Sequence, residues 1–384
     1  MDETAGSVST PDVSVILPAM NEEQTIGTCI SKIQKVFAEK GIHGEIIVSD
    51  ASTDRTPDIA RSMGAIVIHP KKRGYGEAYR EAFDYATGRI IILGDADDTY
   101  DFLELPVFFS ALERGADFVV GSRFKGEIRR NAMPWLHRYV GNPVLTFILN
   151  LIFKTRFSDT HSGFRAITRE ALDRLQFNAT GMEFASEMLI MAAKRGMRIE
   201  EVPISYSPRI APSKLHSFAD GWRHLRYILL LKPIPFLAMP GAVISALGIS
   251  LMALFYTFGE IETSHLHSFI LSAILFSGGM QAILMGLTIK VYSVIHGYED
   301  RRGFIDTIMD YRSLEWIIVL GGFTIFCGFL IGIKIIIDWM AAGFGRMSQI
   351  SNAVVSLSFI FVGLELALSA IFISMMLLND PGSK

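Results

Sequence analysis

The chain has 384 residues, of which half are hydrophobic, and 36 lysines and arginines stand against 39 aspartates and glutamates. The resulting formal net charge of −3 gives no support for nucleic-acid binding. The two cysteines, Cys29 and Cys327, lie in different halves of the chain, which argues against a disulfide framework.

Hydropathy divides the chain into two parts. Residues 1–235 have the mixed composition of a soluble domain, whereas residues 236–378 are mostly apolar. The first twelve residues are polar and acidic without an apolar stretch, so we expect a flexible tail rather than a signal peptide. Residues 379–384 form a second expected tail.

Short apolar runs alternate with helical patterns in the first part. Asn21, with Gln24 three residues later, resembles a capping box at the start of the first helix. The alternation predicts an α/β domain with a mostly parallel sheet covered by helices on both faces. The expected strands are 13–17, 45–49, 65–69, 89–94 and 117–121, and later helices are expected at 74–86 and 102–114.

The segment Asp95-Ala96-Asp97 directly follows the apolar run Ile90–Gly94. In a parallel α/β sheet, ligands bind outside the carboxyl ends of the strands. Two carboxylates at that position suit a hard divalent cation held together with nucleotide phosphates. The alternative is that the pair only caps a helix. The first strand is followed by no glycine-rich dinucleotide fingerprint and no P-loop.

Six short motifs follow one another along the chain: LPAMNE at 17–22, SDASTD at 49–54, GDAD at 94–97, GSRF at 121–124, DTHSGFR at 159–165 and PSKL at 212–215. Their order resembles that of family 2 glycosyltransferases, and in particular of the polyprenyl-phosphate members such as dolichyl-phosphate mannose and glucose synthases. This resemblance implies a GT-A (Rossmann-like) catalytic domain, expected over residues 13–215.

The resemblance also implies roles for individual residues. Asp95 and Asp97 match a site for Mg2+ or Mn2+ and the donor diphosphate, and with Arg123 they form the expected catalytic set. Relatives often carry a glutamine ligand after the second aspartate, where this chain has Asp98-Thr99, so Thr99, Asp98 or water is the third ligand. Expected donor-binding residues are Pro18, Glu22, Asp50, Asp95, Ala96 and Asp97, and expected acceptor-phosphate residues are Arg123, Arg138, Asn142, Arg209 and Lys214.

Several of these polar residues also fit ordinary structural roles. Asp50 and Asp54 suit a plain turn. Arg165 suits either a functional site or an internal partner in the core. Glu183 and Glu187 lie one helical turn apart and share a face, which fits a metal or sugar site as well as a solvated surface.

Two segments combine aromatic, apolar and basic residues. Residues 135–153 and 216–235 are too polar for membrane spans, and they read as helices lying in the membrane interface. The alternative is two ordinary packed helices.

Four later stretches reach the roughly 20 apolar residues that a membrane span needs. They are expected at about 236–258, 268–292, 316–339 and 351–378, with Glu365 deep in the last of them. The loop 293–313 carries Arg301, Arg302 and Arg312, whereas 259–267 has no lysine or arginine. The positive-inside rule then places the catalytic domain and the C-terminus in the cytoplasm. We expect the membrane to be the plasma membrane.

These observations favour transfer of a hexose from a nucleotide diphosphate-sugar to polyprenyl or dolichyl phosphate, with inversion. UDP-glucose or UDP-GlcNAc is the favoured donor and GDP-mannose the alternative; the oligomeric state is left open. Two rival functions are a processive polysaccharide synthase, whose usual QxxRW motif is absent from the chain, and a non-catalytic lipid-linked-sugar binder or flippase.

Overall fold

The computed structural model describes residues 11–210, 217–258, 265–299, 303–345 and 349–378. It divides into two compact units, 1–226 and 227–384. The expected tails, apart from residues 11 and 12, lie outside the described residues, as do Lys214, Arg301 and Arg302. The expectations that concern them therefore stay predictions.

The first unit is built on one seven-stranded sheet, with strand order β3-β2-β1-β4-β6-β5-β7. Only β6 is reversed, because it runs antiparallel to both β4 and β5. All five expected strands are present, but β5 is longer than expected, and β6 and β7 were not expected. The strands are β1 Val13–Ala19, β2 Gly44–Asp50, β3 Ile66–Ile68, β4 Ile90–Leu93, β5 Phe118–Ile128, β6 Arg165–Thr168 and β7 Ile199–Tyr206.

The first helix does not begin where the capping-box pattern placed it. Helix α1 starts at Ile26, after Thr25, and Asn21 lies in the preceding loop with a φ of 55°. The Oδ1 of Asn21 accepts a hydrogen bond of 2.8 Å from the backbone N–H of Thr53. Asn21 therefore joins the loops that follow β1 and β2, and the capping-box prediction is wrong.

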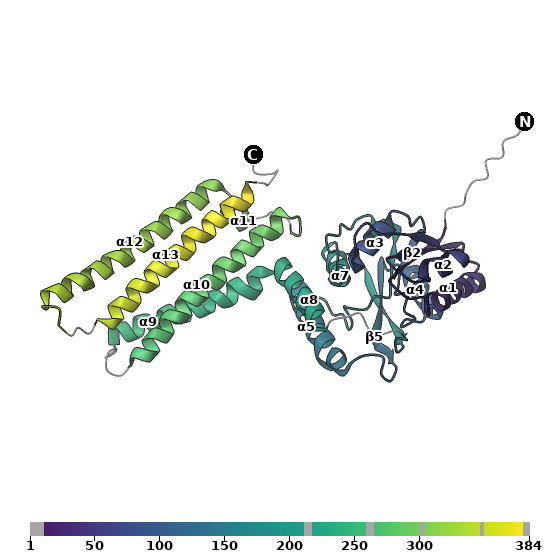
Figure 1. Cartoon of the computed structure of the whole chain (residues 1–384), viewed down its shortest axis with the longest axis horizontal. Coiled ribbons are helices and arrows are strands. Elements are labelled where there is room, and N and C mark those ends of the chain that lie inside the picture. Colours follow the sequence, from purple (N-terminus) through teal and green to yellow (C-terminus); the bar gives the residue numbers. More distant parts are fainter. Residues whose placement is uncertain (1–10, 211–216, 259–264, 300–302, 346–348, 379–384) are drawn as a thin grey trace, which may run out of the picture. The chain divides into compact units, whose positions relative to one another are not determined.

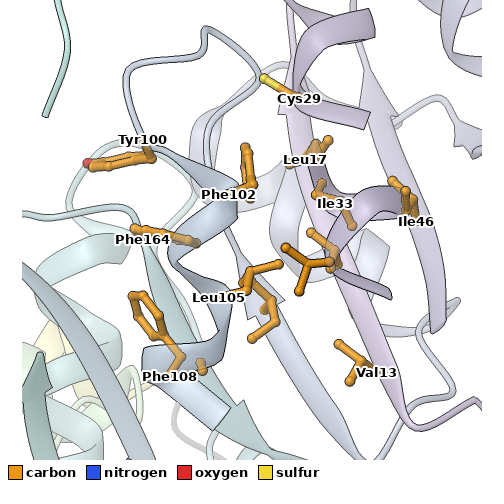
Figure 2. Packing of buried hydrophobic residues seen from close by; sticks show 14 of the residues in the cluster. Val13, Leu17, Cys29, Ile33, Ile46, Tyr100, Phe102, Leu105, Phe108 and Phe164 are labelled. Atoms are coloured by element: carbon orange, nitrogen blue, oxygen red, sulfur yellow. The ribbon is translucent and has the colours of Figure 1, made fainter. Parts of the chain in front are cut away.

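Helices pack on both faces of the sheet, as the alternation of strands and helices predicted. Val15 and Leu17 of β1 face α1 and α4, whereas Ile16 points to the opposite face, covered by α3 and α7. Figure 2 shows the first of these cores. The helices are α1 Ile26–Lys40, α2 Thr56–Ser62, α3 Tyr75–Phe83, α4 Leu105–Glu113, α5 Asn142–Phe153, α6 Arg169–Leu172 and α7 Phe184–Lys194, with a 3-10 turn at Phe102–Glu104.

Helix α5 and the residues before it expose much of their apolar surface. Trp135 is 70% exposed, Phe147 is 66% exposed and Leu151 is 68% exposed. A π-helical turn, His137–Gly141, leads into α5. Helix α8, Ser217–Leu231, falls in the second segment expected at the membrane interface, and its Trp222 is also exposed.

The second unit contains four helices that are long and apolar enough to cross a membrane, in agreement with the four expected spans. In Figure 1, α13 runs between α10 and α12, and close glycine contacts join the helices in pairs. A Cβ on Gly321 of α12 would lie 2.6 Å from the carbonyl oxygen of Gly363 of α13. The four long helices are α9 Met239–Phe258, α10 Leu266–Ile295, α12 Tyr311–Ala341 and α13 Ile350–Leu377, and the short helix α11 Phe304–Ile308 precedes α12.

Candidate active site

The carboxyl ends of β1, β2 and β4 bring three of the predicted segments to one edge of the sheet. Ala19 at the end of β1 is in register with Asp50 at the end of β2. Ile16 is in register with Leu93, the last residue of β4, and Asp95 follows two residues later. Pro18, Asp50 and Asp95 therefore leave the sheet at the same level, where open α/β sheets bind ligands.

Asp95 and Asp97 are held by hydroxyl groups. The Tyr75 hydroxyl donates to Asp95 Oδ1 at 3.1 Å, and the Thr99 hydroxyl donates to Asp97 Oδ1 at 2.6 Å. Burial and the neighbouring charge of Asp97 raise the pKa of Asp95 above its ordinary value. A cation beside Asp95 would stabilise the ionised form of this buried carboxylate.

In the structure, an arginine supplies positive charge to this pair. Arg209 forms an ion pair with Glu22, and its Nε lies 3.5 Å from Asp97 Oδ2. All three side chains are largely buried. The predicted acceptor-phosphate residue Arg209 thus lies against the predicted donor and metal residues.

The backbone of Gly163 packs closely against the side chains of Tyr75 and Asp95. A Cβ at Gly163 would lie 2.7 Å from the Tyr75 hydroxyl and 3.0 Å from Asp95 Oδ2. The backbone N–H of Gly163 donates to the Tyr100 hydroxyl at 2.8 Å. This glycine therefore permits the close approach of two segments at the carboxylate pair.

Arg123 is locked in place by a buried partner. Its Nε and Nη2 donate to the two carboxylate oxygens of Asp159 at 2.7 and 2.8 Å, and its guanidinium lies over the Tyr206 ring. Burial disfavours the charge of Arg123, but the Asp159 carboxylate outweighs burial and raises the pKa of the arginine. Arg123 therefore carries a fixed positive charge. Its other guanidinium N–H groups do not bind Asp159.

Asp50 is buried at the end of β2, yet neither of its carboxylate oxygens has a hydrogen-bond partner among the described residues. His69 Nδ1 lies 3.6 Å from one of them. Buried polar groups are normally hydrogen-bonded, so an unsatisfied carboxylate at a ligand-binding edge suits an external donor. Asp54 differs, because it accepts bonds from Thr56 within its own turn, as the structural alternative predicted.

Arg138 lies in the π-helical turn before α5 and Asn142 is the first residue of α5, and the side-chain contacts of both are local. Arg138 lies beside the Tyr139 ring, and Asn142 Nδ2 lies 3.6 Å from the sulfur of Met133. The structure shows no contact between these two residues and the carboxylate pair among the residues it describes. An open cleft of about 390 Å3 is lined by Asn131, Met133, Pro134, Trp135, Arg138 and Tyr139.

Two polar residues whose roles the sequence left undecided have structural roles. Arg165 is buried and donates to the backbone carbonyls of Thr160, Ser162 and Ala185, so it is a core partner. Glu187 is buried in α7 and accepts the backbone N–H groups of residues 178 and 179 at 2.9 Å, so the solvated-face alternative is wrong for it.

Sequence reasoning assigned no role to Tyr75, Tyr100, Asp159 or Gly163. Asp159 and Gly163 lie within the DTHSGFR motif. The acidic residue in that motif was the one sequence signal that could have suggested a partner for Arg123. Tyr75 stands between Gly74 and Gly76, for which a helix start was favoured over phosphate binding. A Cβ on Gly76 would in fact lie 2.5 Å from a backbone carbonyl oxygen, that of Ala179, so the glycine permits close packing.

Known proteins resemble both units of the chain. Residues 14–176 match glycosyl transferase family 2, and residues 287–377 match the glycosyltransferase family 2 C-terminal transmembrane region. The low-salt glycan biosynthesis hexosyltransferase Agl6 of Haloferax volcanii is 38% identical over 94% of this chain and 88% of its own length. The chain therefore belongs to glycosyltransferase family 2, and it is a membrane-bound glycosyltransferase with a GT-A domain.

Two further similarities concern mainly the first unit. The dolichyl-phosphate hexose transferase of Haloferax volcanii is 37% identical over 55% of this chain and 89% of its own length. A crystal structure of glucosyl-3-phosphoglycerate synthase from Mycobacterium tuberculosis, with Mn2+, UDP and glucosyl-3-phosphoglycerate, has a TM-score of 0.48 and 26% identity. That likeness covers 57% of this chain and 79% of the other.

Proposed function

We propose that this glycosyltransferase moves a hexose from a nucleotide diphosphate-sugar to polyprenyl or dolichyl phosphate. The observation that carries the proposal is the Asp95–Asp97 carboxylate pair at the same sheet edge as the unsatisfied Asp50. Similarity to a hexosyltransferase and to a dolichyl-phosphate hexose transferase supports this reaction class. The four apolar helices provide the bilayer location that a lipid acceptor requires.

The residues present fit a divalent cation. Asp95 and Asp97 would hold Mg2+ or Mn2+, and burial together with the Asp97 charge already favours a cation beside Asp95. Among the described residues there is no group of three or more histidine, cysteine, aspartate or glutamate side chains suited to a metal. Diphosphate oxygens, water or the Thr99 hydroxyl would complete the coordination. The cation would neutralise the diphosphate leaving group.

The donor nucleotide is assigned to the edge formed by β1 and β2. Asp50, whose carboxylate has no hydrogen-bond donor among the described residues, would accept bonds from the base or ribose. Pro18 and Glu22 would line the same position, and the Ala96 backbone would face the diphosphate. We favour UDP-glucose or UDP-GlcNAc as the donor, with GDP-mannose as the alternative.

The acceptor needs cations rather than a base. A phosphate monoester has a second pKa of about 6, so it is mostly dianionic at neutral pH. Arg123 and Arg209 would hold it in line with the anomeric carbon, with Arg138, Asn142 and Lys214 as further contacts. We assign no base role to Asp98, because its carboxylate is paired with Lys32 at 2.8 Å. Direct attack inverts the anomeric centre and gives a β-linked product from an α-linked donor.

The bilayer provides the setting for this transfer. We assign residues 135–153 and 216–235 to the interface, since their exposed aromatic side chains suit lipid headgroups. The catalytic unit would face the cytoplasm, at the plasma membrane, by the positive-inside rule.

The test is release of nucleoside diphosphate by the purified protein with and without polyprenyl phosphate. We expect lipid-dependent release that falls by about two orders of magnitude or more in Asp97→Asn, because a principal electrostatic element of the site is lost. Asp58→Asn is the matched control, since Asp58 forms an ion pair with Arg61 at an exposed position. Full activity of Asp97→Asn, or of the wild type in excess chelator, contradicts the proposal.

A further inference from the structure

Helix α10 turns one narrow face away from the other helices of the second unit. Leu271 is 56% exposed, Ile274 is 61% exposed and Met285 is 50% exposed, and Gly278 and Gln281 are exposed between them. These five residues recur at intervals of three and four, which places them on one side of the helix. In a membrane-bound chain this side, which we call the α10 outer face, meets lipid.

Gln281 is a polar residue on this lipid-facing side of the helix. It is the sixteenth of the 30 residues of α10, so it lies near the middle of the span. Its side-chain amide makes no hydrogen bond to any described residue, although hydrocarbon offers it no partner. Two other polar side chains of the spans are placed differently: Glu365 of α13 is buried within the unit, and Thr324 of α12 bonds to the Leu320 carbonyl of its own helix.

Gly278 lies one turn before Gln281 and leaves the α10 outer face flat. A Cβ built on Gly278 would have no neighbouring atom within 4 Å. By contrast, Gly279 and Gly286 of the same helix are occupied by contacts with Ser245 and Ala238. The glycine on the outer face is therefore not explained by packing within the chain, and it would allow a second helix to approach closely.

We propose that the α10 outer face binds the same face of a second copy of this chain within the bilayer. All copies cross the membrane in one orientation, so two α10 helices related by a two-fold axis along the membrane normal run parallel. Gln281 of each copy then meets Gln281 of the other at the same depth. A carboxamide is both donor and acceptor, so the two side chains satisfy each other reciprocally. An apolar lipid chain offers no such exchange.

The first experiment is disulfide cross-linking of the full-length protein reconstituted in phosphatidylcholine vesicles that contain no other protein. Cysteine is introduced as Ile274→Cys or Met285→Cys, each together with Cys327→Ser, and Cys29 remains buried. Phe326→Cys on α12 is the control, because Phe326 is 57% exposed near the middle of its own span. We expect covalent dimers from both α10 variants and only background from Phe326→Cys. Equal cross-linking at all three positions, or none at the α10 positions, overturns the proposal.

The second experiment asks whether Gln281 and Gly278 drive the contact. In the Ile274→Cys background, Gln281→Leu and Gly278→Ile should each lower the dimer yield by about tenfold, corresponding to loss of the interhelical bond or of close approach. Thr324→Val and Gly322→Ile on α12 are the matched controls. Gly322 also has no atom within 4 Å of a built Cβ, so the Cβ of neither substitution meets an atom of the described residues. Unchanged melting temperatures show that the variants fold. Folded variants that cross-link as well as their parent overturn the proposal.

Discussion

Replacing Arg209 with glutamine should increase the affinity of the protein for Mn2+ in the absence of nucleotide. In the structure the Arg209 guanidinium contacts Glu22 and lies beside Asp97, so it occupies a carboxylate that the metal would use. A cation entering this site has to displace the arginine from Asp97. Removing the guanidinium charge removes that competition while glutamine retains a polar side chain.

The size of the effect follows from the geometry. At the observed 3.5 Å the attraction between Arg209 and Asp97 is about 5 kcal/mol for an effective dielectric constant of about 20. Desolvation offsets most of that attraction, and we take a net of roughly 1.5–3 kcal/mol, between the values typical of exposed and of buried ion pairs. Each 1.4 kcal/mol corresponds to about a tenfold change in affinity, so we expect roughly 10- to 100-fold tighter Mn2+ binding.

The assay is titration of free Mn2+ by electron paramagnetic resonance with the purified protein and no substrate. Arg55→Gln is the control, because it removes the same charge from an arginine paired with Glu23 at an exposed position. Its Mn2+ affinity should change by less than about threefold, as screened surface charges contribute little. Equal Mn2+ affinity in the wild type and Arg209→Gln would show that the arginine does not compete with the metal.

Three further predictions follow from the site and the loops. Gly163→Ala should lower transfer by at least about tenfold, because its Cβ would come too close to Tyr75 and Asp95 at the carboxylate pair. The same overpacking should lower the free energy of unfolding by about 1–3 kcal/mol. An unaffected turnover number argues against this geometry. Arg123→Ala should abolish transfer and also destabilise the protein by about 3–5 kcal/mol, because it leaves the Asp159 carboxylate buried without its partner; an unchanged melting temperature contradicts this. A cysteine at Ser264, outside the described residues, should react with an impermeant thiol reagent added to intact cells, whereas one at Gly303 should not; the opposite labelling pattern reverses the membrane orientation.

The sequence was sufficient where the signal is local. The carboxylate pair was located because an apolar run followed by Asp95 and Asp97 marks a strand end, and parallel strands bring their carboxyl ends together. The family resemblance, rather than this rule, assigned Asp50 to the donor, and the register of β1 with β2 places Asp50 at the same edge. The four spans could also be predicted, since length and hydropathy are read directly from consecutive residues.

The remainder depends on pairs of residues that lie far apart in the chain. Arg209 and Glu22 are separated by 187 positions, and Arg123 and Asp159 by 36, so no periodicity joins them. Asn21 had the local pattern of a helix cap, yet the N–H of Thr53, 32 positions later, is the partner its side chain binds. Helical spacing showed which residues share a face with Glu187, but not that backbone N–H groups of another segment cover it.

The most direct measurement is a transfer assay with the purified protein in vesicles that contain polyprenyl phosphate. A panel of radiolabelled nucleotide diphosphate-sugars is supplied with Mg2+ or Mn2+, and both the lipid product and the released nucleotide are quantified. We predict that at least one donor gives a single β-linked hexose on the lipid monophosphate, with one nucleoside diphosphate released per transfer. A sugar polymer, an α-linked product from an α-linked donor, or no lipid product with any donor would contradict the proposed function.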